Sequence, residues 1–434
     1  MNLRICVIAL IFQLLIFVPV VQAVTPLDEV DAYKTIMIDA KQLDSVIGED
    51  INSLSMAAYN NDYLEPIPYQ IDEYNTAGAV YFEGWDVPLA GTPGVLDSED
   101  KLLFLYKDSG PRRKESARYD GGIVHEIRLS GQGVGDRYVY LVKNSRLRSD
   151  ENYVRYSADE ALVETDFYTV TYDKNNHIEW LDFSVLDYES DKNPFDVLKI
   201  RIFTSVLGGL IDLAFNNNDV KLTPKIERIG PIRTTAQMKM SFQFLGMSVL
   251  NISMQLHHSI RSLTYDVRSN IPAFRRSFAS NPLVFISLEG NDLQGSQIRT
   301  ANGPESPAVT DGKMDDIERA HVNNGVDIDN SWIWASTRRN LDFIAFFDFN
   351  SEQTEDIDFY YNDDAELSDP PERFLGQLPN VGYRINGIPD DGVFGFVVSV
   401  HMSNGFKGNP EIFSGKIRRL PDIVVLDSRR NNLM

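Results

Sequence analysis

Cysteine is almost absent from this sequence of 434 residues, because its single cysteine, Cys6, lies in the apolar leader described below. A chain without cysteine beyond its leader forms no disulfides, thiolate zinc sites, iron–sulfur clusters or covalently attached c-type haem. A large hydrophobic core must stabilise such a protein if it is exported, and the chain is long enough to build one. The lack of cysteine favours a bacterial periplasm or exterior over a eukaryotic secretory route.

Positive charge is also scarce. The chain has 41 Lys and Arg against 63 Asp and Glu, which gives a formal net charge of −22. Such a chain repels phosphate backbones and anionic headgroups, and no basic stripe with interleaved aromatics offsets this repulsion, so nucleic acid is excluded as a partner. The acidity indicates solubility outside the cell, and divalent cation binding is the alternative interpretation.

Recognised catalytic motifs are absent too. The sequence has no Walker loop, no G-x-S-x-G elbow and no H-E-x-x-H pair, and Gly131-Gln132-Gly133-Val134-Gly135 has the wrong spacing for a dinucleotide fingerprint. The motifs therefore define no reaction.

Residues 1–23 have the three parts of a cleavable secretory signal peptide. Arg4 supplies the positive region, residues 5–18 are apolar, and Val21-Gln22-Ala23 is a small-residue cleavage site. The apolar stretch is shorter than the ~20 residues that span a bilayer, so an uncleaved anchor is the weaker alternative. We predict an exported protein, periplasmic or extracellular, with no transmembrane span in the mature chain.

Alternation of apolar and polar residues dominates the rest of the chain, as in residues 138–142, 167–172 and 394–400. This pattern is typical of antiparallel sheets with one buried face. Residues 343–347 are apolar without alternation, as expected of a strand covered on both faces. We predict a mainly β protein of packed antiparallel sheets, a sandwich or a large two-sheet architecture, with few helices.

The type of one element stays open. Residues 194–215 have helical apolar spacing after a capping Asn193 and Pro194, yet residues 198–203 also alternate as a strand with Lys199 and Arg201 outward. Composition suggests four regions after the leader. These are an N-terminal β region (24–160), a central β region (161–288), a polar loop or linker (289–330) and a C-terminal β region (331–434).

Two neighbouring segments near the N-terminus carry a resemblance. Residues 66–74 read PIPYQIDEY and residues 94–110 read GVLDSEDKLLFLYKDSG. Together they resemble a pattern in exported bacterial β-sandwich proteins, some of them linked to polysaccharide breakdown. In that pattern a P-x-Q-x-D strand precedes an acidic turn and an apolar strand ending in Asp and Gly. The resemblance covers a short part of the chain and implies an exported β-sandwich.

The acidic turn within this pattern is a candidate calcium site. Asp97, Glu99 and Asp100 crowd one turn, and Ca²⁺ needs six to eight oxygen ligands. The alternative is a solvated turn whose carboxylates accept hydrogen bonds from backbone amides. A second acidic segment, residues 311–330, does not match the EF-hand loop and reads as a surface loop.

The densest signature for ligand binding lies near the C-terminus. Aromatic and acidic side chains beside Pro turns bind sugars by stacking and by accepting hydrogen bonds from hydroxyls. The candidates are Tyr360, Tyr361, Asp363, Asp364, Tyr383 and His401. The alternative is that Tyr360 points into the core and the rest is an ordinary interstrand loop.

These observations favour an exported binding or accessory protein of the cell envelope or exterior, whose partner is a polysaccharide or an envelope protein. The alternative is a carbohydrate-active enzyme, either a polysaccharide lyase or a glycoside hydrolase. A uronic-acid lyase needs a base, an acid and a group that neutralises a carboxylate, and His401, Tyr383 and Arg384 have the required side chains. Calcium is the one cofactor that the residues suggest.

Overall fold

The computed structural model describes residues 25–427 except 207–208, 245–246, 270–278, 350–355, 368, 375–377 and 388–393. The signal peptide predicted over residues 1–23, with Cys6, lies outside the described residues. In the described part of the chain, the named strands form five sheets, and their pairings are antiparallel. The prediction of a mainly β protein with few helices is confirmed.

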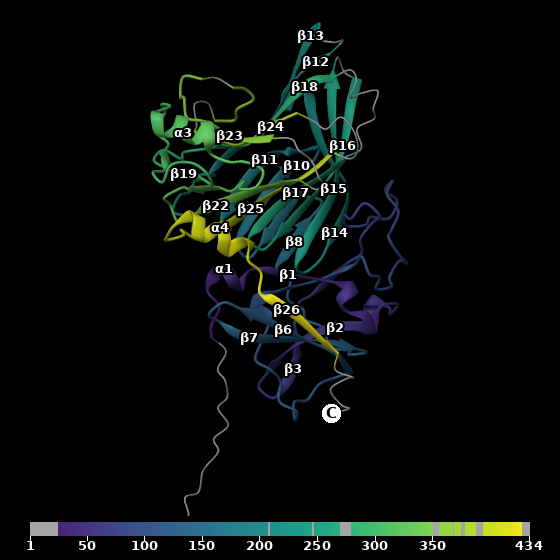
Figure 1. Ribbon diagram of the computed structural model, residues 1–434. Helices are drawn as coiled ribbons and strands as arrows, with labels where there is room; N and C mark the ends of the chain where they lie inside the picture. The colour runs from purple at the N-terminus through teal and green to yellow at the C-terminus, as the bar shows by residue number, and fades with distance from the viewer. Residues whose placement is uncertain are drawn as a thin grey trace, which may run out of the picture.

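The largest sheet has nine strands and forms one layer of a sandwich (Figure 1). Its order across the sheet is β14 (Val220–Ile229), β15 (Arg233–Phe244), β16 (Met247–Ser259), β17 (Ser262–Ser269), β25 (Phe394–Ser403), β22 (Asp342–Phe349), β21 (Ile333–Ser336), β19 (Gln297–Thr300) and β20 (Ala308–Val309).

Two smaller sheets pack on the inner face of this nine-stranded sheet. The four-stranded sheet has the order β11 (Asn176–Val185), β10 (Tyr168–Asp173), β9 (Leu162–Thr165) and β8 (Val154–Ser157). The five-stranded sheet has the order β13 (Ile211–Phe215), β12 (Phe195–Val206), β18 (Ala279–Gly290), β24 (Asn380–Asn386) and β23 (Asp356–Asn362). Buried residues of all three sheets, among them Leu256, Tyr172 and Phe195, belong to one hydrophobic core.

A separate N-terminal body lies at one end of the sandwich (Figure 1). One of its sheets has the order β1 (Thr35–Asp39), β5 (Lys101–Leu105) and β4 (Gln70–Asp72), and the other has the order β26 (Asp422–Asp427), β6 (Gly122–Gly131), β7 (Gly135–Lys143), β2 (Leu54–Asn60) and β3 (Tyr63–Pro66). The last strand of the chain, β26, thus pairs with β6 of the N-terminal body. Short 3-10 turns occur at Ala40–Gln42, Asp44–Val46, Ile51–Ser53, Tyr106–Asp108 and Asn217–Asp219.

The regions expected from composition are interleaved in space. The central strands β14–β17 and the later strands β21, β22 and β25 share the nine-stranded sheet. The segment 289–330, expected as a loop or linker, contains β19, β20 and the helix α3 (Asp316–Asn324). A capping box between Asp315 and Glu318 starts this helix, because each side chain accepts a backbone N–H of the other residue.

The structure shows which secondary structure two ambiguous or unusual sequence patterns adopt. Residues 194–215, whose type was open, form the strands β12 and β13. The strand β22 is covered on both faces, as its unbroken apolar run indicates. Phe343 and Phe347 belong to the main core, while Ile344 and Phe346 pack outward under the helix α4 (Pro410–Arg418). The remaining helix is α1 (Glu29–Ala32), and no helix of the described residues is long and apolar enough to cross a membrane.

The packing of α4 predicts a difference between two adjacent side chains. Phe413 is fully buried and its ring lies 4.2 Å from that of Phe406, whereas Ile412 is 67% exposed. Phe413→Ala should lower the free energy of unfolding by about 3–5 kcal/mol, because it removes buried apolar surface and leaves a cavity. Ile412→Ala, the matched control, should change it by about 0.5 kcal/mol or less. Urea denaturation measures both, and equal effects would contradict this packing.

Candidate functional site

The outer face of the nine-stranded sheet is polar along its centre. The strand register sets Thr235 opposite His257, His257 opposite Thr264, and Thr264 opposite Ser399. Residues directly opposite one another share a face of the sheet, so these four side chains form a row across β15, β16, β17 and β25. Neighbouring positions on the same face are Arg233, Gln237, Gln255, Ser259, Ser262, Asp266, Val397 and His401.

Several of these polar side chains are buried and hydrogen-bonded to each other. Thr235 Oγ1 lies 2.9 Å from Nδ1 of His257, and Gln255 Nε2 donates to Gln237 Oε1 at 2.9 Å. Gln255 also donates to the carbonyl oxygen of Val80 at 2.7 Å and accepts from the Val80 N–H at 3.1 Å. Because Val80 lies in the loop between β4 and β5, this loop of the N-terminal body rests on the sheet and fixes the side chains.

A buried ion pair joins the N-terminal body to the sheet next to this contact. Arg233 Nε donates to Asp72 Oδ2 at 2.7 Å, and Asp72 Oδ1 accepts from Gln70 Nε2 at 2.7 Å. Gln70 Oε1 in turn accepts from the backbone N–H of Arg233 at 3.1 Å, and Arg233 Nη2 donates to the hydroxyl of Tyr74 at 3.2 Å. Asp72 is fully buried and Arg233 is 7% exposed. These hydrogen bonds offset the cost of removing both charges from water.

A small cavity of about 140 Å³ lies at the other end of the polar face. Its lining includes His401 of β25, Arg261, and Tyr33 and Lys34 beside α1. The Arg261 guanidinium lies 4.2 Å from the ring centroid of Tyr33 and 4.1 Å from that of Phe167. These two rings hold the cation by cation–π attraction and fix its orientation.

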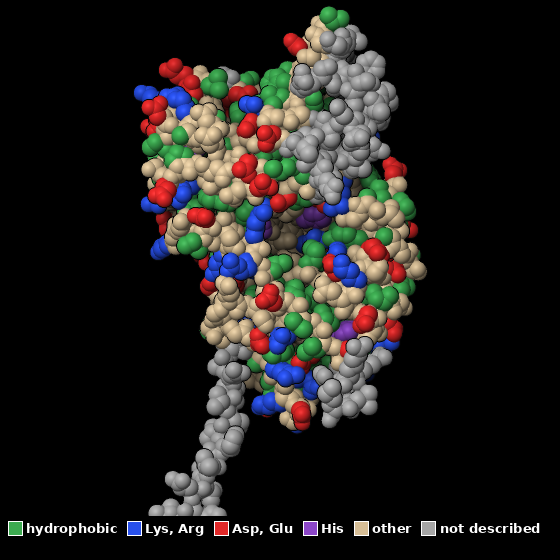
Figure 2. Space-filling model, viewed as in Figure 1, with side chains coloured by type: hydrophobic (Ala, Val, Ile, Leu, Met, Phe, Trp, Pro, Cys, Tyr) green, Lys and Arg blue, Asp and Glu red, His purple; other side chains and the backbone are tan. Residues whose placement is uncertain are grey.

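The space-filling view shows a hollow near the centre of the face that carries α4 (Figure 2). Histidine and Lys or Arg side chains gather at this hollow, above the N-terminal body. We name the polar row at Thr235, His257, Thr264 and Ser399, with the cavity at His401, the outer-face hollow.

Both histidines of the outer-face hollow are uncharged at neutral pH. Burial, with Arg233 nearby, lowers the pKa of His257 well below its usual value. Burial and the charge of Arg418 lower the pKa of His401 to about 4. A neutral imidazole has one donor and one acceptor nitrogen, as a hydroxyl group also donates and accepts. These two imidazoles therefore complement hydroxyl groups of a ligand, and the cations Arg261 and Lys34 line the same cavity as His401.

The residues predicted to bind a ligand lie in separate places. Tyr361 is buried and its hydroxyl donates to Glu318 Oε1 at 3.0 Å, while Asp363 accepts the backbone N–H groups of Asp311 and Gly312 at 2.7 and 3.0 Å. Asp364 accepts a backbone N–H within its own turn. Tyr361 lies on β23 and belongs to the core, while Asp363 and Asp364 follow this strand in a loop whose contacts are made within the protein.

Tyr383 lies inside the sandwich, whereas His401 lies on its outer surface. Tyr383 points into the core from β24, where its hydroxyl donates to the carbonyl oxygen of Ser331 at 2.7 Å. His401 is on the outer face of the nine-stranded sheet, and Arg384 forms an ion pair with Asp358 at 3.3 Å on the five-stranded sheet. The structure therefore does not bring together the three side chains suggested for a lyase.

The acidic turn is hydrogen-bonded to the backbone. Asp97 Oδ2 accepts from the N–H of Thr92 at 2.6 Å, and Asp100 accepts from the N–H groups of Tyr74 and Asp97 at 3.2 and 2.8 Å. Glu99 accepts from the hydroxyl of Ser98. Among the described residues, no group of three or more His, Cys, Asp or Glu side chains is placed to hold a metal ion. The turn matches the backbone-capping alternative to a calcium site.

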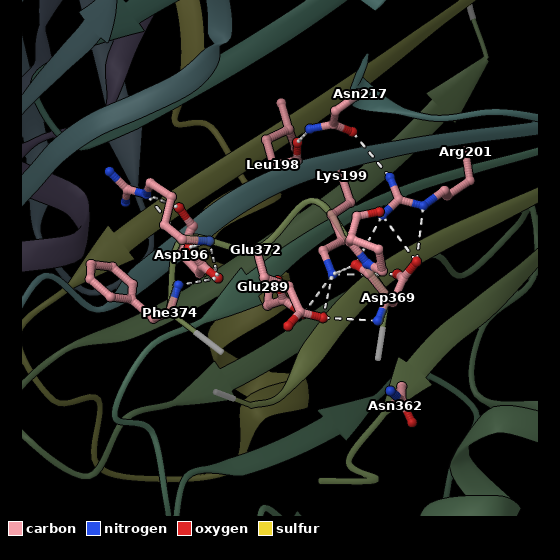
Figure 3. A network of polar contacts seen from close by, with 12 residues as sticks. Asp196, Leu198, Lys199, Arg201, Asn217, Glu289, Asn362, Asp369, Glu372 and Phe374 are labelled. Carbon is pink, nitrogen blue, oxygen red and sulfur yellow. Dashed lines mark hydrogen bonds and ion pairs between the residues drawn. The ribbon is translucent and has the colours of Figure 1, made fainter. Parts of the chain in front are cut away.

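A second polar network lies on the outer face of the five-stranded sheet (Figure 3). Lys199 is fully buried, and its Nζ lies 2.7 Å from Glu289 Oε1 and donates to the carbonyl oxygen of Asp369 at 2.5 Å. Arg201 Nη2 lies 3.1 Å from Asp369 Oδ1, and Glu372 Oε1 lies 3.7 Å from Lys199 Nζ. This Lys199 network fastens the loop at Asp369 onto β12 and β18.

Tyr360 lies near the Lys199 network rather than in the core. Its ring centroid is 5.1 Å from that of Phe285, which in turn lies 5.8 Å from that of Phe203. Burial raises the pKa of Tyr360, and the charge of Asp369 adds to this rise. Tyr360 is thus separated from the outer-face hollow by the thickness of the sandwich.

Two solved structures align with this chain at low TM-score and low identity. An α-mannosidase from Enterococcus faecalis V583 matches with a TM-score of 0.46 and 9% identity, over 91% of this chain and 45% of that one. A gh92 family glycosyl hydrolase matches with a TM-score of 0.24 and 12% identity, over 59% of this chain and 30% of that one. This chain thus spans less than half of either protein. No protein-family model and no curated protein matches the sequence.

The sequence holds a weak signal for the outer-face hollow. Between Arg233 and Lys239, the positions that alternate with the core on β15 and β16 are Thr235, Gln237, Gln255 and His257, rather than the Lys and Glu typical of a solvated sheet face. Polar residues with few charges indicate a covered face. The loop after Asp72 covers these residues. Because this loop is distant from them in sequence, the pattern alone does not identify the site.

The Lys199 network predicts a pH dependence of stability. Burial raises the pKa of Glu289 from 4.5 to about 7, while Lys199 opposes this rise. A carboxyl whose folded pKa is raised binds more protons when folded, so its contribution to stability falls as pH rises from about 4.5 to 7.

The test compares the wild-type protein with Glu289→Gln by denaturation between pH 4.5 and 7. The wild type should lose stability relative to this variant as pH rises. The control is Glu83→Gln at an exposed position, which should parallel the wild type. A difference between wild type and Glu289→Gln that stays constant with pH would contradict the assignment.

Proposed function

We propose that this protein is exported and binds a carbohydrate in the outer-face hollow. The observation that carries the proposal is the row of uncharged polar side chains at His257, Thr264 and Ser399, in which the fully buried Thr235 lies 2.9 Å from Nδ1 of His257 and orients its ring. Sugar hydroxyls both donate and accept hydrogen bonds, and neutral imidazole, hydroxyl and amide groups complement them. The export expected from residues 1–23 would expose such a site to glycans outside the cytoplasm.

Preorganisation supports binding in this hollow. The bonds from Gln255 to Val80 and Gln237, and from His257 to Thr235, hold these side chains in place before a ligand arrives. Fixed side chains lose little conformational entropy on binding, which raises affinity. The partly buried ring of Tyr74 borders the face and offers a stacking surface for the apolar side of a sugar.

A carbohydrate-active enzyme is the second candidate, and one observation favours it. Arg233, Tyr74 and His257 lie close together, and these side chains could neutralise a carboxylate, donate a proton and accept one. The low pKa of His257 weakens it as a base, since an efficient general base titrates near the working pH. Binding without turnover is therefore the function that the geometry supports better.

The proposal is tested by calorimetric titration of the mature protein with oligosaccharides, both neutral and acidic, chosen by their shift of the melting temperature. Thr264→Val keeps the shape of the side chain and removes one hydroxyl, so it should weaken binding by about two- to tenfold. His257→Gln should weaken it by a similar factor. Melting temperatures of the free variants show whether each one is folded.

The matched control is Tyr360→Phe, which changes one polar group on the opposite side of the sandwich. This variant should bind like the wild type. Weaker binding by Tyr360→Phe alone would place the ligand at the Lys199 network, and no binding to any glycan would refute the proposal. Release of shortened or unsaturated sugars, lost in His257→Gln, would favour the enzyme.

A further inference from the structure

The interior of the sandwich contains a cavity of about 130 Å³ where its three sheets meet. The lining residues come from the four-stranded sheet (Trp180, Phe183), the five-stranded sheet (Leu198, Leu288) and the nine-stranded sheet, which contributes Ala335 among others. Protein interiors are close-packed, and voids larger than a water molecule are few. A cavity of this size is therefore a feature that needs an explanation.

Its lining suits an apolar molecule. Phenyl, indole, aliphatic and proline side chains make up most of the wall. Two of its hydroxyl groups are already hydrogen-bonded within the protein, because Ser296 Oγ lies 2.7 Å from Thr310 Oγ1 and Thr337 Oγ1 donates to the carbonyl oxygen of Leu341 at 2.8 Å. A buried water molecule needs two to four polar partners, so this mostly apolar wall stabilises a water molecule poorly. Apolar cavities of about 150 Å³ bind benzene.

Two lining side chains, Trp180 and Tyr265, carry polar atoms that face each other, and neither has another hydrogen-bond partner among the described residues. The indole N–H of Trp180 can only donate, so the hydroxyl of Tyr265 is its acceptor and keeps its own proton to donate. Both side chains are more than nine-tenths buried, since Trp180 is 4% and Tyr265 is 8% exposed. A buried donor without a partner is costly, and a ligand atom that accepts a hydrogen bond would remove that cost.

The Lys199 network stabilises one wall of this cavity. Leu198 and Leu288 line the cavity and are opposite each other in the register of β12 and β18. Their neighbours Lys199 and Glu289 point to the outer face, where their ion pair at 2.7 Å joins the same two strands (Figure 3). The wall is therefore held in place from outside, and the cavity is preformed.

We propose that this internal cavity binds a small apolar molecule of about the size of a substituted benzene, with one hydrogen-bond acceptor directed at the hydroxyl of Tyr265. This site is independent of the outer-face hollow, which lies on the other side of the nine-stranded sheet. The ligand class follows from the cavity volume, its apolar wall and the hydroxyl proton of Tyr265, which has no acceptor among the described residues.

The experiment uses two probes with the same number of heavy atoms. Anisole carries an ether oxygen as an acceptor and ethylbenzene carries none. The affinity of each for the mature protein is measured by ligand-observed NMR and by the shift of the melting temperature. Anisole should bind about two- to tenfold more tightly than ethylbenzene, as expected for one additional hydrogen bond.

Two variants separate the volume of the cavity from its donor. Ala335→Leu fills the cavity and should abolish binding of both probes, while Ala158→Leu, at an exposed position, should leave it unchanged. Tyr265→Phe should keep ethylbenzene binding and reduce the preference for anisole. Melting temperatures without probe report whether each variant is folded.

Three results would overturn the proposal. They are the absence of binding of either probe to the wild-type protein, binding that survives Ala335→Leu in a folded variant, and an anisole preference that persists in Tyr265→Phe. Glycan binding at the outer-face hollow does not enter any of them, so the two proposals stand or fall separately.

Discussion

The buried ion pair between Asp72 and Arg233 is the contact on which the rest of this arrangement depends. It joins β4 of the N-terminal body to β15 of the nine-stranded sheet, and Gln70 satisfies the remaining oxygen and the adjacent backbone N–H. Removing one partner of such a pair is costly, because the other charge stays buried. Because the loop after Asp72 lies on the sheet, Gln255 and its neighbours are buried and oriented. The short P-x-Q-x-D pattern thus has a physical role as a joint between two parts of the molecule.

Much of the fold could be predicted because its signals are local. The alternating segments 138–142, 167–172 and 394–400 match β7, β10 and β25, and an unbroken apolar run identified β22 as covered on both faces. Residues 194–215, whose type the sequence left open, show which of the two conflicting patterns, helical spacing or strand alternation, matches the structure. Lys199 and Arg201 alternate with core residues, and burying both in ion pairs on one face outweighs the helix-like spacing of the apolar residues. The helix α3 was not expected, because its polar composition resembles a loop and its start depends on the capping box at Asp315.

The candidate site could not be predicted because it depends on contacts between distant residues. His401 and Tyr383 belong to strands of different sheets, and His401 faces outward from the sandwich while Tyr383 points into its core. The carboxylates of Asp97 and Asp363 accept backbone N–H groups, which sequence cannot distinguish from ligand binding. His257 could be recognised as facing away from His258, but its neighbours are set by sheet register and by a loop about 180 residues away, at Val80.

Hydrogen exchange followed by mass spectrometry tests the central claim most directly, with a glycan that raises the melting temperature. Amide exchange reports local opening of the backbone, so a ligand in the outer-face hollow should slow it in β16, in β17 and in the loop at Val80. Slowing in these three segments together, with no change at β23 around Tyr360, is the predicted result. Slowing confined to β23 and the loop at Asp369, with the three segments unchanged, would contradict the account.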